Sequence, residues 1–135
     1  MGAVYTKIKL TNAIDEALIS RGLLAPNLLR ECEVNALVDS ATYLVIPTEI
    51  VNKLGLRIRG QQKAKYADGK EDIGVTEALL IECEGRQTTE DALVTGDMIL
   101  IGQVVLEKLD LLVDCKNQRL IPNPASPHYP ITYIL

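Results

Sequence analysis

Positions 4–10 alternate between apolar or small side chains and polar ones, which is the pattern of a strand with one buried face. Asn12 follows and can cap a short helical turn through residues 15–19, which Gly22 would end. Residues 28–38 predict the next strand. Its charged members thin out towards residue 38, so we expect this strand to enter the core as it ends.

An acid then stands between two apolar runs. Asp39 directly follows the apolar run at 36–38, and a second apolar strand at 43–46 comes shortly after it. Bare burial of a carboxylate is costly, so an aspartate in this place must be hydrogen-bonded or must share a proton with a neighbour. The pattern therefore marks Asp39 as the first candidate for a functional residue.

A short helix and a hairpin are predicted next. Residues 47–55 begin with Pro and Thr, carry a narrow apolar stripe and end in Gly, as a short helix does. Two strand-like runs, at 56–67 and 71–82, flank the sequence Ala-Asp-Gly-Lys at 67–70. Asp-Gly between two such runs is a strong hairpin signal.

The second half of the chain continues with short elements. Another hairpin is expected at Glu84-Gly85, with residues 87–94 as its return strand. The remaining pattern predicts an apolar strand at 98–102, a helix at 103–109, strands at 111–113 and 119–121, a Pro-rich loop at 122–127 and a last strand at 131–135.

Many short strands at close spacing, with few and short helices, indicate a mostly antiparallel β domain folded as a sandwich or a small barrel. The 135 residues suit one domain, 1–135, with a core over 1–124 and a Pro-rich tail over 125–135.

Composition narrows the class of protein further. The chain is 47% hydrophobic but has five Tyr and neither Phe nor Trp, so its core must be aliphatic. The net charge is −4 and no basic run stands out, which argues against a nucleic-acid partner. No apolar segment approaches the roughly 18 to 20 residues that cross a bilayer, and the N-terminus lacks a secretory signal. We therefore expect a cytoplasmic protein without a membrane partner.

Cysteine and histidine offer little chemistry. Cys32, Cys83 and Cys115 lie far apart and form no CxxC pair, which argues against a disulfide framework and against a zinc site. His128, the only histidine, lies between prolines in the tail, so a catalytic set that needs it is disfavoured. No metal and no cofactor are expected.

Several motifs in order resemble a known family. They are Ala36-Leu37-Val38-Asp39-Ser40-Ala41, the strand from Tyr43 to Pro47, the hairpin about Asp68-Gly69, Leu100-Ile101-Gly102 with the helix after it, and Leu120-Ile121-Pro122-Asn123-Pro124. Together they are similar to the retropepsin-like, or retroviral-type, aspartic proteases in their small prokaryotic single-domain form. The resemblance implies an all-β acid-protease half-barrel, closed and antiparallel with one or two short helices, that carries one half of an active site.

The resemblance also implies a mechanism and a partner. The family needs two aspartates about one water, and like charges so close share a proton. One chain supplies one such residue, so two Asp39 side chains would meet in a homodimer and hydrolyse an extended peptide. By the same resemblance Ser40 would bond across the dimer, and Gly102 after Ile101 would allow close packing behind the Asp39 loop. The tail over 125–135 would be a candidate strand of the dimer interface. The hairpin tip would close over the substrate through Tyr66, Ala67, Asp68 and Gly69.

The loop after Asp39 departs from the family pattern. The family has Gly after Asp-Thr/Ser, whereas Ser40 is followed here by Ala41 and Thr42, and the stretch to Pro47 is one residue shorter. Either the Gly is missing, or Ala41 takes its place and the gap falls later. Taken alone, Asp-Ser-Ala is also common in surface turns. Two functions stay open: a dimeric aspartic endopeptidase, and a module of the same fold that binds peptide or dimerises without catalysis.

Overall fold

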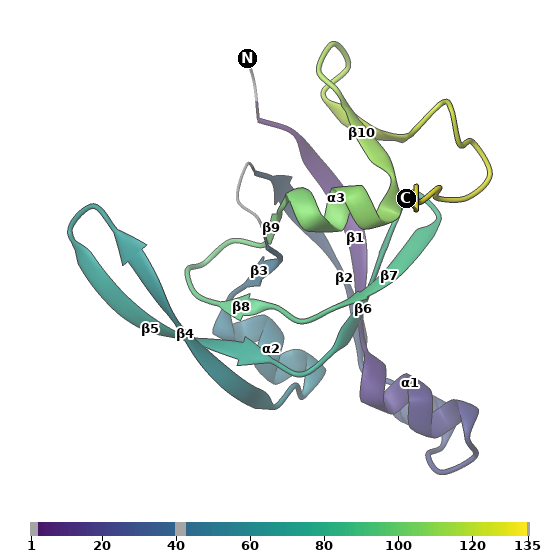
Figure 1. Cartoon of the computed structure of the whole chain (residues 1–135). Helices are drawn as coiled ribbons and strands as arrows, with labels where there is room; N and C mark the ends of the chain where they lie inside the picture. Colours follow the sequence, from purple (N-terminus) through teal and green to yellow (C-terminus); the bar gives the residue numbers. More distant parts are fainter. Residues whose placement is uncertain (1–2, 40–42, 135) are drawn as a thin grey trace.

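The computed structural model describes residues 3–39 and 43–134 and shows a mostly β chain with three α-helices in this part (Figure 1). The helices are α1 (Ala13–Ser20), α2 (Thr48–Leu54) and α3 (Gln103–Leu109), with a short 3-10 turn, η1 (Pro26–Leu28). The strands are β1 (Tyr5–Asn12), β2 (Glu31–Val38), β3 (Val45–Ile46), β4 (Ile58–Tyr66), β5 (Gly69–Thr76), β6 (Leu79–Cys83), β7 (Arg86–Glu90), β8 (Leu93–Val94), β9 (Leu100–Ile101), β10 (Leu111–Asp114) and β11 (Arg119–Pro122).

One curled sheet forms a half-barrel. Its strand order is β4-β5-β8-β3-β9-β2-β1-β6-β7, and β10 pairs separately with β11. The pairings in the curled sheet are antiparallel except for β2 with β9 and β3 with β8. The prediction of a mostly antiparallel β half-barrel is therefore confirmed, with two parallel pairs and with three α-helices instead of one or two in the described part of the chain.

The first predicted elements form as the sequence pattern indicates. Alternate residues of β1 are buried, and β1 leads directly into α1 through Asn12. The Asn12 side chain accepts hydrogen bonds from the N–H groups of Ile14 (2.9 Å) and Asp15 (3.0 Å), so it caps α1. Its amide group also donates to the Leu54 carbonyl at 2.8 Å, which ties the start of α1 to the end of α2.

An ion pair between buried Asp15 and half-exposed Arg30 fixes the start of β2. The Asp15 carboxylate accepts from the Arg30 backbone N–H (3.1 Å), from Nε (2.8 Å) and from Nη2 (2.9 Å). The hydrogen bonds from the Arg30 guanidinium hold the pKa of Asp15 below its usual range, although burial acts in the opposite direction. The strand that leads to Asp39 therefore begins at a fixed point.

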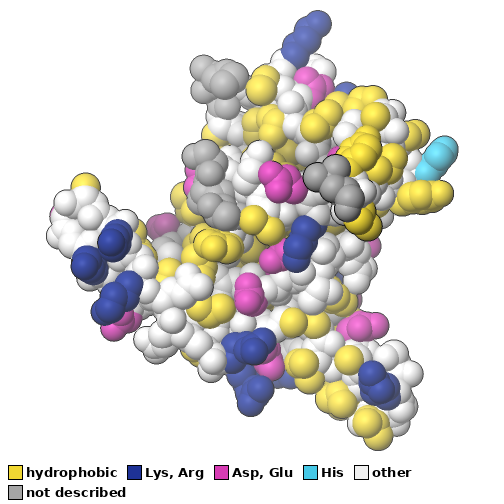
Figure 2. Space-filling view, in the orientation of Figure 1, with side chains coloured by type: hydrophobic (Ala, Val, Ile, Leu, Met, Phe, Trp, Pro, Cys, Tyr) yellow, Lys and Arg dark blue, Asp and Glu magenta, His cyan; other side chains and the backbone are white. Residues whose placement is uncertain are grey.

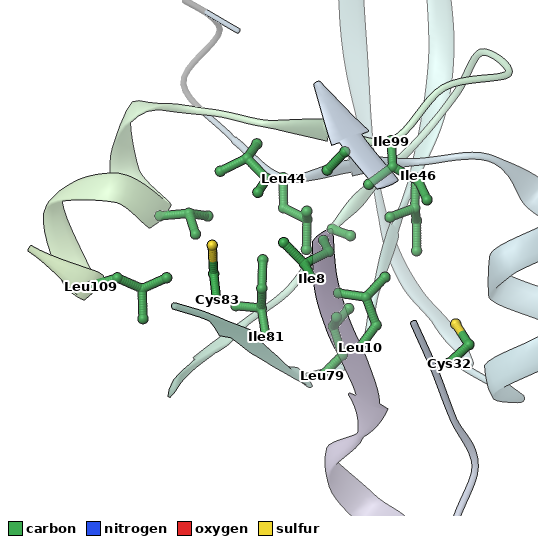
Figure 3. Packing of buried hydrophobic residues seen from close by; sticks show 14 of the residues in the cluster. Ile8, Leu10, Cys32, Leu44, Ile46, Leu79, Ile81, Cys83, Ile99 and Leu109 are labelled. Atoms are coloured by element: carbon green, nitrogen blue, oxygen red, sulfur yellow. The ribbon is translucent and has the colours of Figure 1, made fainter. Parts of the chain in front are cut away.

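The core is aliphatic, as the composition requires (Figure 3). Strands β1 and β6 contribute Ile8, Leu10, Leu79 and Ile81, all almost completely buried, and Leu109 of α3 packs on the same cluster. Full burial of one such side chain stabilises the fold by about 1.5 to 3 kcal/mol. The core thus lies between β1, β6 and the helices, on the opposite side of the curled sheet from the apolar surface described below.

Several predicted strands are shorter than expected or divided. β2 begins at Glu31 because Pro26 opens a 3-10 turn before it, and the expected strand at 43–46 pairs only over β3. The run at 71–82 breaks after Thr76, whose side chain accepts from the Ala92 N–H at 3.0 Å while the chain crosses from β5 to β6. The return strand at 87–94 likewise divides into β7 and β8.

The last predicted strand does not form in the single chain. Residues 131–134 have no strand geometry, and the Ile131 N–H donates instead to the Asp110 carboxylate at 3.2 Å. Ser126 is buried in the same tail and bonds to Asp110 as well. The tail is therefore held to the end of α3 by side-chain contacts and not by a ladder. As for membranes, none of the described helices is long and apolar enough to cross one.

Candidate active site

Asp39 stands at the end of β2, where β9 lies between β2 and β3. The Leu37 N–H donates to the Ile99 carbonyl at 2.8 Å, and the Asp39 N–H donates to the Ile101 carbonyl at 3.0 Å. Strands β2 and β3 are consecutive along the chain, yet both pair with β9. The segment that carries Asp39 thus leaves the sheet on one side of β9 and returns on the other, with its backbone anchored to that strand.

The neighbours of Asp39 differ in how they are placed. Ile101 is completely buried in the core, and Gly102 is buried where α3 begins. Gly102 has φ −94° and ψ −179°, an extended conformation that any residue adopts, so its backbone angles alone do not call for glycine. The predicted role of Gly102 in close packing stays a prediction. Ser40, Ala41 and Thr42 lie outside the described residues.

The strand registers align one face of the sheet with Asp39. In an extended strand, residues two apart point to the same side, so Leu37 and Asp39 share a face. Residues paired directly across two strands also share a face. The residues that share a face with Asp39 therefore continue from β2 through β9, β3, β8 and β5. The inner face defined in this way consists of Leu37, Leu100, Val45, Leu93, Val75 and Ile73.

This inner face is a second apolar surface, separate from the core. Val45 and Ile73 are 8% and 5% exposed, but they do not belong to the core cluster. Leu37, Leu93 and Leu100 are half-buried. Because Leu37, Leu93 and Leu100 keep part of their apolar surface exposed, the arrangement suits contact with a ligand or with another chain.

The predicted hairpin continues the inner face outwards. Strands β4 and β5 stand out from the rest of the molecule in Figure 1, and their turn residues are Ala67 and Asp68, one position earlier than Asp-Gly suggests. Tyr66 pairs with Gly69 and lies on the same face as Ile73 by alternation along the two strands. Of the four predicted tip residues, Tyr66 is therefore the one whose side chain shares the inner face.

The other face of this hairpin is basic. Lys63, Lys65 and Lys70 alternate with the residues of the inner face, and Figure 2 shows the dark blue groups gathered on the hairpin. The Lys63 Nζ atom forms an ion pair with the Asp72 carboxylate at 3.0 Å, whereas Lys65 and Lys70 are cross-strand neighbours of like charge. The hairpin thus has a side that continues the apolar surface and a charged side that faces water.

Cavities lie beside the inner face. One of about 190 Å³ is lined by Val45, Leu100 and the segment 95–98. A larger one of about 300 Å³ lies next to it, on the other side of Asp97 and Met98, and includes Leu37 in its wall. Both cavities therefore adjoin the strands on either side of Asp39.

Comparison with known proteins agrees with this geometry at the level of the fold. No protein-family model matches the chain, and no curated protein sequence does. Among solved structures, the retroviral protease-like domain of Ddi1 from Leishmania major superposes with a TM-score of 0.57 and 16% sequence identity. The match covers 92% of this chain and 90% of that domain.

The chain has a retropepsin-like fold. The match covers nearly the whole chain, so it includes the curled sheet with the inserted β9 and the projecting hairpin. At 16% identity, the likeness concerns the fold and leaves the chemistry to the residues of this chain.

Other candidate groups for catalysis are poorly placed. Cys32 and Cys83 are free but buried, and burial raises the pKa of both thiols, which disfavours the reactive thiolate. Cys115 is free and exposed in the β10–β11 turn, and His128 is exposed in the tail. Among the described residues, no three His, Cys, Asp or Glu side chains gather as metal ligands would.

The sequence did not indicate most of the inner face. Val45, Leu93 and Leu100 come from different short strands, and only their registers place them side by side. The one available signal was the turn sequence Thr95-Gly96-Asp97 just before an apolar run, which is typical of a loop beside a buried strand. Asp97 and Met98 were missed because nothing in their own pattern says which cavity they line.

Proposed function

We propose that the protein is a homodimeric aspartic endopeptidase in which two copies of Asp39 activate a water molecule. The observation that carries the proposal is the position of Asp39 at the end of β2, anchored to Ile101 on the inserted strand β9 and placed at the inner face. The retropepsin-like fold supports this choice, because a half-barrel with one such acid is one half of a two-aspartate site.

The chemistry needs both halves. Two carboxylates beside one water cannot both ionise easily, so they share one proton and titrate as a pair. The ionised carboxylate takes a proton from the water, which attacks the scissile carbonyl, and the protonated one donates to the carbonyl oxygen. Asp39 is partly exposed in the single chain, so a second copy can approach it.

The substrate proposed for this site is an extended peptide. The inner face offers apolar contacts from Leu37, Leu100 and Val45 next to Asp39, and the β4–β5 hairpin can cover a bound chain with Tyr66. Extended peptides bind such sites through main-chain hydrogen bonds, while alternate side chains enter pockets. The cavities of about 190 and 300 Å³ are of the size that single side chains occupy.

Replacement of the acid tests the proposal. Asp39→Asn removes the general base and the shared proton, so cleavage of a peptide library should fall by at least about a thousandfold, as loss of a central catalytic group does. The control is Asp91→Asn, which changes an exposed aspartate between β7 and β8 and should leave cleavage unchanged. Peptide cleavage that persists in Asp39→Asn would assign the activity to another site.

Dimerisation is the second requirement. Sedimentation or light scattering at working concentration should show a dimer, because one chain holds one such aspartate at its inner face. Peptide cleavage should therefore fall more steeply than the protein concentration on dilution below the dissociation constant. A strictly monomeric protein that still cleaved peptides would contradict the paired-Asp39 mechanism.

The sequence after Asp39 favours a second candidate function. The family pattern has Gly after Asp-Thr/Ser, whereas Ser40 is followed here by Ala41 and Thr42, and the loop is one residue short: either the Gly is missing, or Ala41 takes its place and the gap falls later. A displacement of about 1 Å can lower catalysis a hundredfold. A module that binds peptides or dimerises without cutting would keep the inner face and the hairpin but lose the aligned pair.

Insertion of Gly between Ser40 and Ala41 separates the two functions. If the short loop impairs catalysis, the insertion should raise peptide cleavage by about tenfold or more, since it restores the family length. Insertion of Gly between Lys116 and Asn117, in the exposed β10–β11 turn, serves as a control for a lengthened loop away from both cavities. No gain from the first insertion would indicate that loop length does not limit the activity.

A further inference from the structure

We propose that the cavity of about 300 Å³ beside Asp39 binds a lysine or arginine side chain of a peptide, so that the protein selects substrates with a basic residue near the cut. This inference rests on the proposed peptide-binding function and names the substrate class. Its evidence is the position, the walls and the charge of the cavity.

The cavity lies within reach of a peptide held at Asp39. Leu37 forms part of its wall and comes two residues before Asp39, about 7 Å away along an extended strand. Asp97 and Met98 line both this cavity and the smaller one beside Leu100. A peptide that lies along the inner face can therefore place one side chain in each cavity, on the two sides of the 97–98 segment.

The walls suit a long aliphatic stem. Leu37, Ile50, Met98 and Ile99 line the cavity and are apolar. Lysine and arginine bury their methylene stems along apolar surface while they keep the charged head near polar groups. A volume of about 300 Å³ is at the lower end for small-molecule sites, which fits a single side chain better than a cofactor.

The charge of the walls selects a cation. Glu49 of α2 and Asp97, both exposed to solvent, contribute two carboxylates, and no Lys or Arg lines this cavity. Neither carboxylate forms an ion pair with another described residue. Lys53 lies one helical turn after Glu49, but it does not line the cavity. An incoming ammonium or guanidinium group would therefore bring the positive charge that the cavity lacks.

Binding to an inactive variant tests this without any need for catalysis. The probe is a series of labelled ten-residue neutral peptides in which a single lysine moves from one end to the other, each matched with a norleucine peptide of the same shape. The Asp39→Asn chain is titrated with each peptide, and affinity is measured by fluorescence anisotropy. At one position lysine should improve affinity by about tenfold over norleucine, as a charge-assisted hydrogen bond does.

Two double variants locate the effect. Glu49→Gln with Asp97→Asn, in the Asp39→Asn chain, should abolish the lysine preference and leave norleucine affinity unchanged. Asp91→Asn with Glu107→Gln alters net charge equally at two exposed acids outside the cavity and should keep the preference. In NMR spectra, methyl signals of Leu37, Ile50 and Ile99 should shift with the lysine peptide, whereas those of core Leu79 should not.

The outcomes separate this inference from the proposed catalysis. Equal affinity of the lysine and norleucine peptides at every position would overturn the cation-binding proposal. A lysine preference that survives in the Glu49→Gln, Asp97→Asn variant would overturn it too, as would one that is lost equally in the Asp91→Asn, Glu107→Gln control. Absence of any binding would also overturn it. If the native chain cut peptides without a preference for basic residues, the cation-binding proposal would be wrong and the proposed protease function would be supported. If the lysine preference in binding held and the native chain cut no peptide, the cation-binding proposal would be supported and the protease function would be wrong.

Discussion

Two hairpins of this chain, β4–β5 and β6–β7, both have two-residue turns but lie in opposite environments. The β6–β7 hairpin buries Leu79, Ile81 and Cys83 in the core, and its turn places Glu84 and Gly85 at positive φ, as a type I′ turn requires. The β4 strand is exposed at nearly every position, and its hairpin stands away from the molecule (Figure 1). A clear turn signal in the sequence therefore does not tell whether a hairpin packs in the core or projects into solvent.

The β6–β7 hairpin is also hydrogen-bonded to the end of α3 and to the C-terminal tail. Arg86 is buried at the start of β7 and donates to the carbonyls of Leu109 and Asp110, at 3.0 and 2.9 Å, and to that of Ser126. One side chain therefore joins β7, the end of α3 and the tail. The β4–β5 hairpin is held only at its base in the described part of the chain, by its pairing with β8 and by Thr76, whose N–H donates to the Ala92 carbonyl at 2.9 Å. Its freedom fits the covering role proposed for Tyr66.

The largest expected effect is a difference in the free energy of unfolding between variants of the two hairpins. Ile81→Ala leaves a cavity in the core and should lower the free energy of unfolding by about 3 to 4 kcal/mol, measured by urea denaturation. Tyr66→Ala on the projecting hairpin should change the free energy of unfolding by less than about 0.5 kcal/mol, because its side chain is half exposed. It should instead weaken peptide binding. A large loss of stability in Tyr66→Ala would show that the hairpin is structural.

The same contrast explains how much the sequence revealed. Strand β1 and the helices α1 and α3 were predictable, because the alternation about Ile8, the cap at Asn12 and the apolar spacing after Gly102 are local properties of the sequence. Asp39 was identifiable because it interrupts apolar runs. The inner face was not predictable, because it depends on the register between strands far apart in sequence, such as Val45 with Leu100. In the single chain residues 131–134 form no strand, and the Ile131 N–H donates to Asp110 instead.

Acid should release the tail from Asp110. Hydrogen bonds from Ser126, Asn123 and the Ile131 N–H hold the pKa of Asp110 below its usual range. A lowered pKa means that these contacts stabilise the tail fully above the ordinary value of about 3.9 and are lost as pH falls through the folded value. The Ile131 amide signal, followed by NMR from pH 7 to pH 2, should therefore shift below about pH 4.

Two variants assign that acid transition. Asp110→Asn should remove the pH dependence of the Ile131 signal, because the titrating carboxylate is gone. Asp114→Asn is the matched control: Asn117 and Arg119 hydrogen bonds also lower the pKa of Asp114, but these partners lie in and after the β10–β11 turn. That variant should leave the Ile131 transition unchanged. A transition that persists in Asp110→Asn would mean that another acid holds the tail.

The smallest expected effect concerns why the β4–β5 hairpin stays loosely held. Lys65 and Lys70 are directly opposite on its basic face, and like charges so placed weaken a strand pair by a few tenths of a kcal/mol. Lys65→Thr should therefore slow amide hydrogen exchange near the turn by roughly twofold and leave the free energy of unfolding unchanged. Lys63→Thr, which breaks the 3.0 Å pair with Asp72, should speed the same exchange. Faster exchange in both variants would mean that each lysine supports the hairpin through its stem, and that charge repulsion does not keep it free to open.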